Sequence, residues 1–256
     1  MRTAVVTGSA SGLGAAIAAK LEVDGCRVIG VDVRDATVIA DLSSDEGRST
    51  MVAGVEEALG GADSGLDVLV ACAGVGPHLT DHGVIASVNF FGAVATLDGL
   101  YPYLQRGSAP TAVAITSNSL GFVPAFEPMH TACLDGDEPT ARAAAGDTDG
   151  STAYATAKHA LAIAVRRRAA DWGAAGIRLN GVSPGPVETP LLEATRHDPV
   201  FGPFVDTLPI PLGRSAQPAE IAGVVAFVLS PESAVMHGSI VVVDGGTDAL
   251  MRPEDV

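Results

Sequence analysis

Tyr154 and Lys158 are the two side chains in this sequence that are best placed for proton transfer. They stand four residues apart in Ser151-Thr-Ala-Tyr-Ala-Thr-Ala-Lys, so on a helix they share one face. An ammonium beside a phenol favours the phenolate and lowers the pKa of the tyrosine, which suits a general acid–base near neutral pH. The alternative is a Tyr and a Lys that only border a core stripe, which Leu161 and Val165 continue.

A glycine-rich turn near the start of the chain is the second chemical signal. The apolar run Thr3–Thr7 leads directly into this turn, and a helix is expected to follow. Glycines permit a tight turn and let the backbone approach a pyrophosphate, which then sits at the helix N-terminus. An ordinary strand–helix turn is the alternative. The candidate phosphate-binding residues are Gly8, Ser11, Gly12, Leu13 and Gly14.

An acidic residue at the end of the second apolar run favours NAD over NADP. Asp32 follows Gly12 by 20 residues. A carboxylate at this place accepts hydrogen bonds from ribose hydroxyls and repels a 2′-phosphate. Neighbouring Arg34 could soften this preference. Asp41 and Leu42 are further cofactor-binding candidates, although a helix N-cap or a turn is an equally good role for Asp41.

Short β-rich runs alternate with longer segments of helical period along the chain. This order predicts one α/β domain over residues 1–256, a Rossmann-type, doubly wound parallel sheet with helices on both faces. The expected strands are Thr3–Thr7, Arg27–Val31, Leu66–Ala71, Ala112–Thr116, Ile177–Val182 and Ser239–Val243. The expected helices are Gly12–Val23, Asp45–Leu59, Ile85–Leu104, Thr152–Trp172 and Pro218–Leu229.

Two segments interrupt this alternation. Residues 118–150 form an insertion rich in turn residues and acids, which we expect to contain a helical turn or to have a functional role. Residues 184–214 combine prolines with bulky apolar side chains, and the stretch 187–214 predicts a mobile substrate lid. Plain core packing explains this stretch nearly as well. The apolar lid candidates are Leu191, Leu192, Phe201, Phe204, Val205, Leu208 and Ile210.

Composition limits the kinds of partner. Among 256 residues, Lys and Arg number 15 against 30 Asp and Glu, so the formal net charge is −15. This charge repels phosphate backbones and anionic surfaces, so neither nucleic acid nor a membrane is expected as a partner. Cys26, Cys72 and Cys133 are widely spaced and indicate a reducing, cytoplasmic location. The six histidines lack metal-ligand spacing, so no metal site is expected.

Several motifs occur together in one order along the chain: Thr7-Gly-Ser-Ala-Ser-Gly-Leu-Gly14, Asn89, Ser117, Tyr154-x-x-x-Lys158 and Pro184-Gly185. In this combination the sequence resembles the short-chain dehydrogenase/reductase family over essentially its whole length. Within the family it is most similar to the 3α-hydroxysteroid dehydrogenase/carbonyl reductase group. The similar features are Asp32-Val-Arg-Asp35, the long insertion before Tyr154 and the tail from Asp244 to Pro253.

The resemblance implies a role for each matching residue. Ser117 would hydrogen-bond the substrate oxygen, Tyr154 would move the proton, and Lys158 would also bind the nicotinamide ribose. Asn89 would hold a water that links Lys158 to solvent. The resemblance places the remaining cofactor-binding candidates beneath the adenosine, at Ala73 and Gly74, and around the nicotinamide, at Pro184, Gly185, Val187 and Thr189.

One position departs from the family pattern. Where Asn-Asn-Ala-Gly is usual, this chain has Ala71-Cys72-Ala73-Gly74. The Cys72 thiol cannot supply the hydrogen bonds of an amide, so other groups must support this loop. We expect Cys72 to be a buried structural thiol rather than a reactive one.

Residues and resemblance together predict reversible hydride transfer between NAD(H) and a secondary alcohol or ketone, with a hydroxysteroid or another bulky hydrophobic carbonyl compound as substrate. A 3-oxoacyl-carrier-protein-type reductase is the alternative within the class, but Asp32 and the net charge oppose its usual 2′-phosphate pocket and basic docking surface. A non-catalytic NAD-sensing binding protein is the alternative from another class.

The resemblance also bears on assembly. The family's common tetramer pairs the helices that here carry Asn89 and Tyr154, and the insertion at 118–150 should obstruct that contact. Its acidic residues would also repel their copies across a two-fold axis. We therefore predict a homodimer built on the helix Pro218–Leu229 and the strand Ser239–Val243, with a new interface formed by the insertion itself as the alternative.

Overall fold

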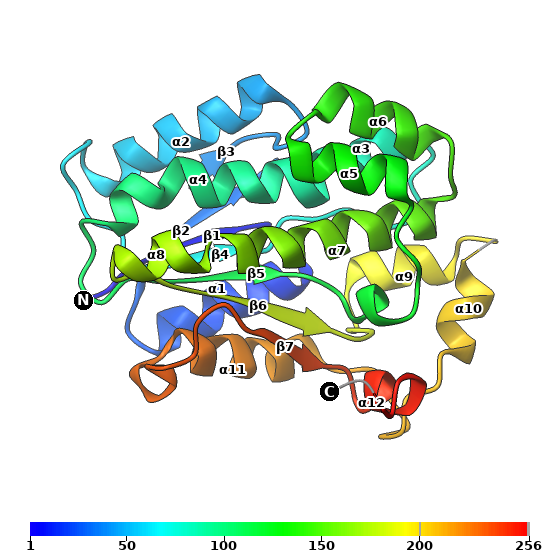
Figure 1. Cartoon of the computed structure of the whole chain (residues 1–256). Helices are drawn as coiled ribbons and strands as arrows, with labels where there is room; N and C mark the ends of the chain where they lie inside the picture. Colours follow the sequence, from blue (N-terminus) through cyan, green and yellow to red (C-terminus); the bar gives the residue numbers. More distant parts are fainter. Residues whose placement is uncertain (200, 255–256) are drawn as a thin grey trace.

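A seven-stranded sheet runs through the middle of the molecule (Figure 1). The structure is a computed structural model that describes residues 1–199 and 201–254. Its strands are β1 (Thr3–Thr7), β2 (Arg27–Asp32), β3 (Val38–Ile39), β4 (Val68–Ala71), β5 (Thr111–Ile115), β6 (Arg178–Pro184) and β7 (Ile240–Val243). Their order is β3-β2-β1-β4-β5-β6-β7 and each neighbouring pair is parallel. The order reverses between β1 and β4, which is where ligands bind in such sheets.

The central strands are buried on both faces, and this explains their uninterrupted apolar sequences. All four residues of β4 and all five of β5 are buried. One face of the sheet packs against α1 (Gly12–Val23) and α11 (Pro218–Leu229), which lie side by side (Figure 1). The predicted doubly wound α/β fold is confirmed.

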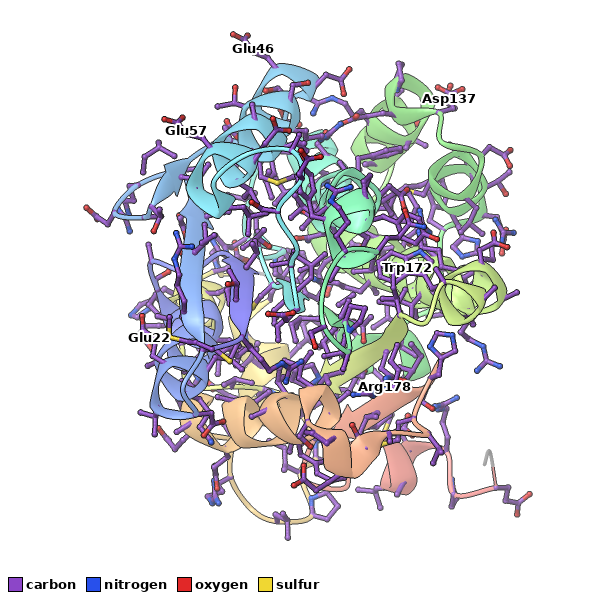
Figure 2. The ribbon with its side chains drawn as sticks, turned by 90° about the vertical axis from the view of Figure 1, so that its left-hand side faces the viewer. Glu22, Glu46, Glu57, Asp137, Trp172 and Arg178 are labelled. Carbon is purple, nitrogen blue, oxygen red and sulfur yellow. The ribbon has the colours of Figure 1, made fainter. Side chains whose placement is uncertain are left out.

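The opposite face of the sheet carries the second helical layer, which lies above the strands in Figure 1. Its members are α2 (Asp45–Leu59), α4 (Ala93–Leu104), α7 (Gly150–Arg167) and the short α8 (Ala169–Ala174). Leu97, Leu100, Leu161 and Val165 are fully buried in the core of this layer. Glu46 and Glu57 on α2 and Asp137 before α6 are exposed acidic residues that point outward from the molecule (Figure 2).

The segment His82–Leu104 is one continuous helical stretch in three parts. It comprises α3 (His82–Ala86), a π-helical turn η1 (Ser87–Gly92) and α4, whereas the sequence predicts a regular helix over Ile85–Leu104. The segment is apolar and long enough to cross a membrane, with a mean hydropathy of 1.4, but 72% of its most apolar window is buried in the fold. That burial is typical of a core helix. A π turn within a helix frequently marks a functional site.

The insertion folds as two helices, which is more structure than the single helical turn that we expected. After the 3-10 turn η2 (Asn118–Gly121) come α5 (Glu127–Asp135) and α6 (Glu138–Gly146). Gly136 ends α5 with φ of +77°, and the Asp137 carboxylate caps α6 by accepting the Thr140 N–H at 3.1 Å. These local stop and start signals explain the two-helix form.

The insertion is anchored to the second helical layer. Helix α5 packs on α7, and α6 packs on α3. The buried Arg48 on α2 donates to Glu138 Oε1 at 2.8 Å. Burial alone would raise the pKa of Glu138, but its hydrogen bonds and the charge of Arg48 hold that pKa below its ordinary value. The insertion therefore covers the outer face of the helices that surround Asn89 and Tyr154.

The segment after β6 also contains helices. It carries α9 (Pro190–Arg196) and α10 (Gly202–Thr207), and beyond β7 lies α12 (Thr247–Met251). A 3-10 turn, η3 (Pro231–Ser233), follows α11. These elements, like the two-residue strand β3, are too short to show a periodic sequence pattern.

Candidate active site

One large cavity of about 720 Å³ opens at the carboxyl ends of the strands. It spans the switch point between β1 and β4 and extends beneath α9 and α10. Of the catalytic and cofactor-binding candidates Asn89, Ser117, Tyr154, Lys158 and those of the glycine turn, the β2 end and the later loops, Asn89 is the one that does not line it. The candidates that line it are Gly8, Ser11, Gly12, Leu13, Gly14, Asp32, Asp41, Leu42, Ala73, Gly74, Ser117, Tyr154, Lys158, Pro184, Gly185, Val187 and Thr189.

The glycine-rich turn forms one end of this cavity. Gly8 and Gly12 have φ of +72° and +53°, a region that glycine adopts without strain. A Cβ on Gly14 would lie 2.0 Å from the carbonyl oxygen of Gly8, so only glycine lets α1 approach the turn. The Ser11 side chain makes no capping hydrogen bond and the first turn of α1 has no acidic residue. The first N–H groups of α1 are thus left without a side-chain acceptor, which suits an anion.

Asp32 lies at the end of β2 beside this turn. Its Oδ2 accepts the Ala10 N–H at 3.0 Å and its Oδ1 accepts the Val33 N–H at 2.7 Å. These two bonds fix the carboxylate at the rim of the cavity. Asp41 is exposed, and its Oδ1 accepts the Ser43 N–H at 2.9 Å. It therefore forms a turn and is not a helix cap, because Ser44 caps α2.

The loop after β4 is supported by Thr7 where the family pattern has an amide. The Thr7 hydroxyl accepts hydrogen bonds from the backbone N–H groups of Cys72 at 3.0 Å and Ala73 at 3.1 Å. Thr7 therefore supplies support for the loop that the Cys72 thiol cannot give. Burial raises the pKa of the Cys72 thiol to about 12. The thiol is therefore protonated at neutral pH, in agreement with a structural role.

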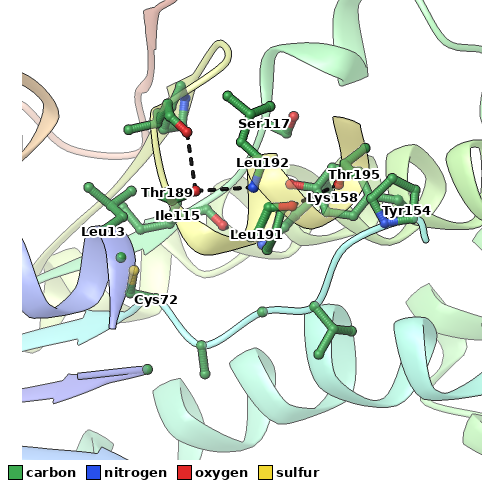
Figure 3. Close-up of a pocket in the computed structure, with 18 of the residues that line it drawn as sticks. Leu13, Cys72, Ile115, Ser117, Tyr154, Lys158, Thr189, Leu191, Leu192 and Thr195 are labelled. Atoms are coloured by element: carbon green, nitrogen blue, oxygen red, sulfur yellow. Dashed lines mark hydrogen bonds between the residues drawn. The ribbon is translucent and has the colours of Figure 1, made fainter. Parts of the chain in front are cut away.

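Lys158 is buried at the opposite end of the cavity, with only 4% of its surface exposed. Its Nζ donates to the carbonyl oxygen of Ile115, at the end of β5, at 2.8 Å. Burial lowers the pKa of Lys158 to about 8. The Lys158 Nζ lies 6.0 Å from the ring centroid of Tyr154, so the helix face that the sequence predicts is formed (Figure 3).

The pKa of Tyr154 differs from the expectation. Burial raises the pKa of the phenol above its ordinary value, and hydrogen bonding with Ser117 offsets only part of this effect. Our prediction that the neighbouring Lys158 lowers this pKa was wrong for the chain alone, because the loss of solvent outweighs the effect of the partners. Tyr154 thus holds its proton at neutral pH.

Asn89 lies behind the cavity wall, within the π turn η1. Its Oδ1 accepts the Val75 N–H at 2.8 Å, and its Nδ2 donates to the Val75 carbonyl at 2.9 Å. A Cβ on Gly74 would lie 3.0 Å from Asn89 Oδ1 and 3.5 Å from Lys158 Nζ. Gly74, which lines the cavity, therefore lies between Asn89 and the cavity. The role of Asn89 in holding a water stays a prediction.

The Pro184-Gly185 turn, at the end of β6, also lines the cavity. A Cβ on Gly185 would lie 2.9 Å from the Cα of Asp244, so this turn also needs glycine. Thr189 caps α9: its Oγ1 accepts the Leu192 N–H at 3.3 Å and donates to the Val187 carbonyl at 3.1 Å (Figure 3).

The space beyond Ser117 and Tyr154 is mainly apolar. Of the lid candidates, Ile210 is the one that does not line the cavity. The lining also includes residues that the sequence did not predict, among them Ser119, Phe122, Val123 and Ser151. The spacing of Ser119 is the signal that could have found it, because a second hydroxyl two residues after a serine can fold back on the first.

The cavity thus combines a dinucleotide-type turn with a serine, a phenol and an ammonium, a set that can bind a nicotinamide cofactor and transfer a proton. The family profile described as short chain dehydrogenase matches residues 2–129, and that described as enoyl-(acyl carrier protein) reductase matches residues 139–248. The chain belongs to the short-chain dehydrogenase family, as its motifs predict. It is an enzyme of the oxidoreductase class that uses a nicotinamide cofactor.

Particular relatives are similar over the whole length. The 3-alpha-hydroxysteroid dehydrogenase/carbonyl reductase of Comamonas testosteroni is 46% identical, with 99% of each chain covered. The crystal structure of the 3-alpha-hydroxysteroid dehydrogenase from Pseudomonas sp. B-0831 complexed with NADH is 44% identical, with a TM-score of 0.96 and coverage of 99% of this chain and 100% of that one. The trans-4-hydroxycyclohexanecarboxylate dehydrogenase of Sinomonas cyclohexanicum is 31% identical, covering 97% of this chain and 93% of the relative.

Proposed function

We propose that this protein transfers a hydride reversibly between NAD(H) and a secondary alcohol or ketone, with a hydroxysteroid or another bulky hydrophobic carbonyl compound as its substrate. One observation carries the proposal. A single cavity holds the glycine turn and Asp32 at one end and Ser117, Tyr154 and Lys158 at the other. The cofactor and the proton-transfer groups thus share one space.

Each polar group has a task in this reaction. The nicotinamide, when bound, supplies or accepts the hydride. The Ser117 hydroxyl donates a hydrogen bond to the substrate oxygen, and Tyr154 gives its proton to that oxygen in reduction and removes it in oxidation. The raised pKa of Tyr154 keeps this proton in place at neutral pH. Lys158 stabilises the phenolate that forms and binds the nicotinamide ribose.

Several features favour NAD as the cofactor. The uncapped start of α1 fits a pyrophosphate, and the Asp32 carboxylate fits ribose hydroxyls but opposes a 2′-phosphate. Asp41 and Leu42 extend this end of the cavity. The solved relative complexed with NADH supports the same choice.

The substrate class is supported by the apolar wall of the cavity. Leu191 and Leu192 on α9 and Phe204 and Val205 on α10 line the space beyond Tyr154. Such a wall stabilises a substrate in proportion to the apolar area that it buries, at about 25 cal/mol per Å². The relatives described above at 46% and 44% identity are named as 3-alpha-hydroxysteroid dehydrogenases, which supports the same substrate class.

We also propose that the protein is a cytoplasmic homodimer. The free thiols of Cys26, Cys72 and Cys133 support a reducing compartment. The insertion covers the helices that carry Asn89 and Tyr154, while Phe227 on α11 and Val242 on β7 are 49% and 39% exposed. These exposed apolar side chains support α11 and β7 as the dimer surface.

A substrate panel with one matched pair of variants tests the proposal. Steroid, terpenoid and aliphatic alcohols are assayed by NADH absorbance, with NADP run alongside. We expect the highest kcat/KM for a hydroxysteroid with NAD. Tyr154→Phe should lose most turnover yet still bind NADH. Tyr101→Phe, which keeps the ring packed on Trp172 and removes a hydroxyl that accepts from the Gln105 side chain, should be close to wild type. Near-normal turnover in Tyr154→Phe, or better use of small polar alcohols, would contradict the proposal.

A further inference from the structure

Ser119 lies on the turn η2 and lines the cavity next to Ser117. Its Oγ donates to Ser117 Oγ at 3.0 Å, and its backbone N–H donates to the same oxygen at 3.3 Å. A serine hydroxyl has two acceptor positions and a single hydrogen to donate. Ser119 therefore occupies both acceptor positions of Ser117.

This arrangement determines where the Ser117 hydrogen points. With both lone pairs taken, its O–H is directed away from Ser119, toward the cavity and the Tyr154 hydroxyl. A donor that is oriented before the reaction stabilises negative charge on a substrate oxygen without a reorganisation cost. A chain of two hydroxyls also polarises the terminal one.

Two further contacts hold the turn in this form. The buried Asn118 side chain donates to Asp244 Oδ2, beyond the end of β7, at 3.1 Å. The Val123 N–H donates to the Ser119 carbonyl at 2.9 Å. The Ser119 backbone is thus fixed by contacts that do not involve its own hydroxyl, so removal of that hydroxyl should leave the turn in place.

We propose that Ser119 is a positioning residue that orients the Ser117 hydroxyl toward the reacting oxygen. This inference rests on the proposed function of Ser117. Ser119 acts through Ser117 and so affects stabilisation of the transition state. Binding of the substrate depends mainly on the apolar wall, which Ser119 does not form. The hydroxyl, rather than the size of the side chain, carries the effect.

The experiment compares Ser119→Ala with Ser119→Thr, which keeps a hydroxyl. We expect Ser119→Ala to lower kcat on the order of tenfold, with the substrate KM, NADH binding and melting temperature nearly unchanged. Ser119→Thr should restore most of kcat. Ser49→Ala, an exposed serine on α2, is the matched control and should not change kcat. Wild-type kcat in Ser119→Ala, or a drop that Ser119→Thr does not rescue, would overturn the inference.

A double-mutant cycle with Ser117→Ala separates this inference from the proposed function. If Ser119 works through Ser117, Ser119→Ala should have no additional effect on the residual turnover of Ser117→Ala. The same fold-loss in both backgrounds would show that Ser119 acts independently and would overturn the inference alone. Full activity of Ser117→Ala would overturn the proposed role of Ser117 and the inference with it.

Discussion

His78 Nδ1 and Thr195 Oγ1 lie 3.3 Å apart and join two segments that are 117 residues apart in the chain. His78 belongs to the loop after β4, and Thr195 belongs to α9. The Thr195 hydroxyl donates its hydrogen to the Leu191 carbonyl at 2.9 Å, so it accepts from the imidazole N–H. This hydrogen bond joins the loop after β4 to α9, and Thr195 also lines the cavity that we propose for the cofactor.

We predict that His78→Ala speeds cofactor release. Without the His78–Thr195 bond, α9 should open more easily, so NADH should dissociate several-fold faster, as a net loss of about 1 kcal/mol implies. Stopped-flow measurement of NADH fluorescence gives the rate directly. Thr195→Val should have the same effect, whereas His197→Ala, an exposed histidine on the same segment, should have none. Equal release rates in the wild type and the three variants would show that this hydrogen bond does not slow cofactor release.

Features encoded within a few adjacent residues could be predicted from the sequence. Gly14 and the Tyr154–Lys158 pair are examples, because a turn or a helix face fixes their geometry locally. The support of the Cys72 backbone by Thr7 depends on how segments 65 residues apart in the chain meet. The pKa of Tyr154 depends on burial, which no local pattern specifies.

Secondary structure could likewise be predicted where adjacent residues fix it, and not elsewhere. The helix over Asp45–Leu59 was predicted with its observed bounds, since a capping serine and a following glycine mark its ends. The π turn at Ser87–Gly92 was not predicted, because a regular helix has the same apolar pattern. The stretch 187–214, for which we predict a substrate lid, is visible in the sequence as apolar residues between prolines, but its two helices are too short to show a period.

Lys158 should make the stability of the protein depend on pH. Its pKa is about 8 in the folded chain and about 10.4 in an unfolded one. The cost of burying the ammonium is fully present below pH 8 and is relieved as the pH rises to 10.4, because the unfolded chain then binds more protons. This relief amounts to about 3 kcal/mol.

Lys158→Met, which keeps the length but not the charge, isolates this effect. The free energy of unfolding of the variant, relative to wild type, should be highest below pH 8 and should fall steadily toward pH 10.4. Urea denaturation at a series of pH values measures it. A difference between the two proteins that stays constant with pH would show that Lys158 does not change its pKa on folding.

Asp32 should control the choice between NAD and NADP. Asp32→Ser removes the charge that opposes a 2′-phosphate, so the ratio of kcat/KM for NAD to that for NADP should fall at least tenfold, or about 1.4 kcal/mol. Asp35→Asn is the matched control, because Asp35 is an exposed acid three residues further on with φ of +48°, which asparagine also adopts. A wild-type preference for NADP, or an equal change in both variants, would refute the role of Asp32.

Phe227 should mark the surface between two copies of the chain. It projects from α11, and the neighbouring β7 is an edge strand that pairs with β6 alone. Phe227→Asp would place two like charges close to a two-fold axis, where each surface meets its own copy. We therefore expect light scattering to show a wild-type dimer and a monomeric variant at micromolar concentration. Ile39 on the opposite edge strand β3 is 53% exposed, so Ile39→Asp also replaces an exposed apolar side chain with a charge. The Ile39→Asp protein should remain a dimer. A tetramer that pairs through the helices carrying Asn89 and Tyr154 would contradict the prediction, since α5 packs on α7 and α6 packs on α3 and η1.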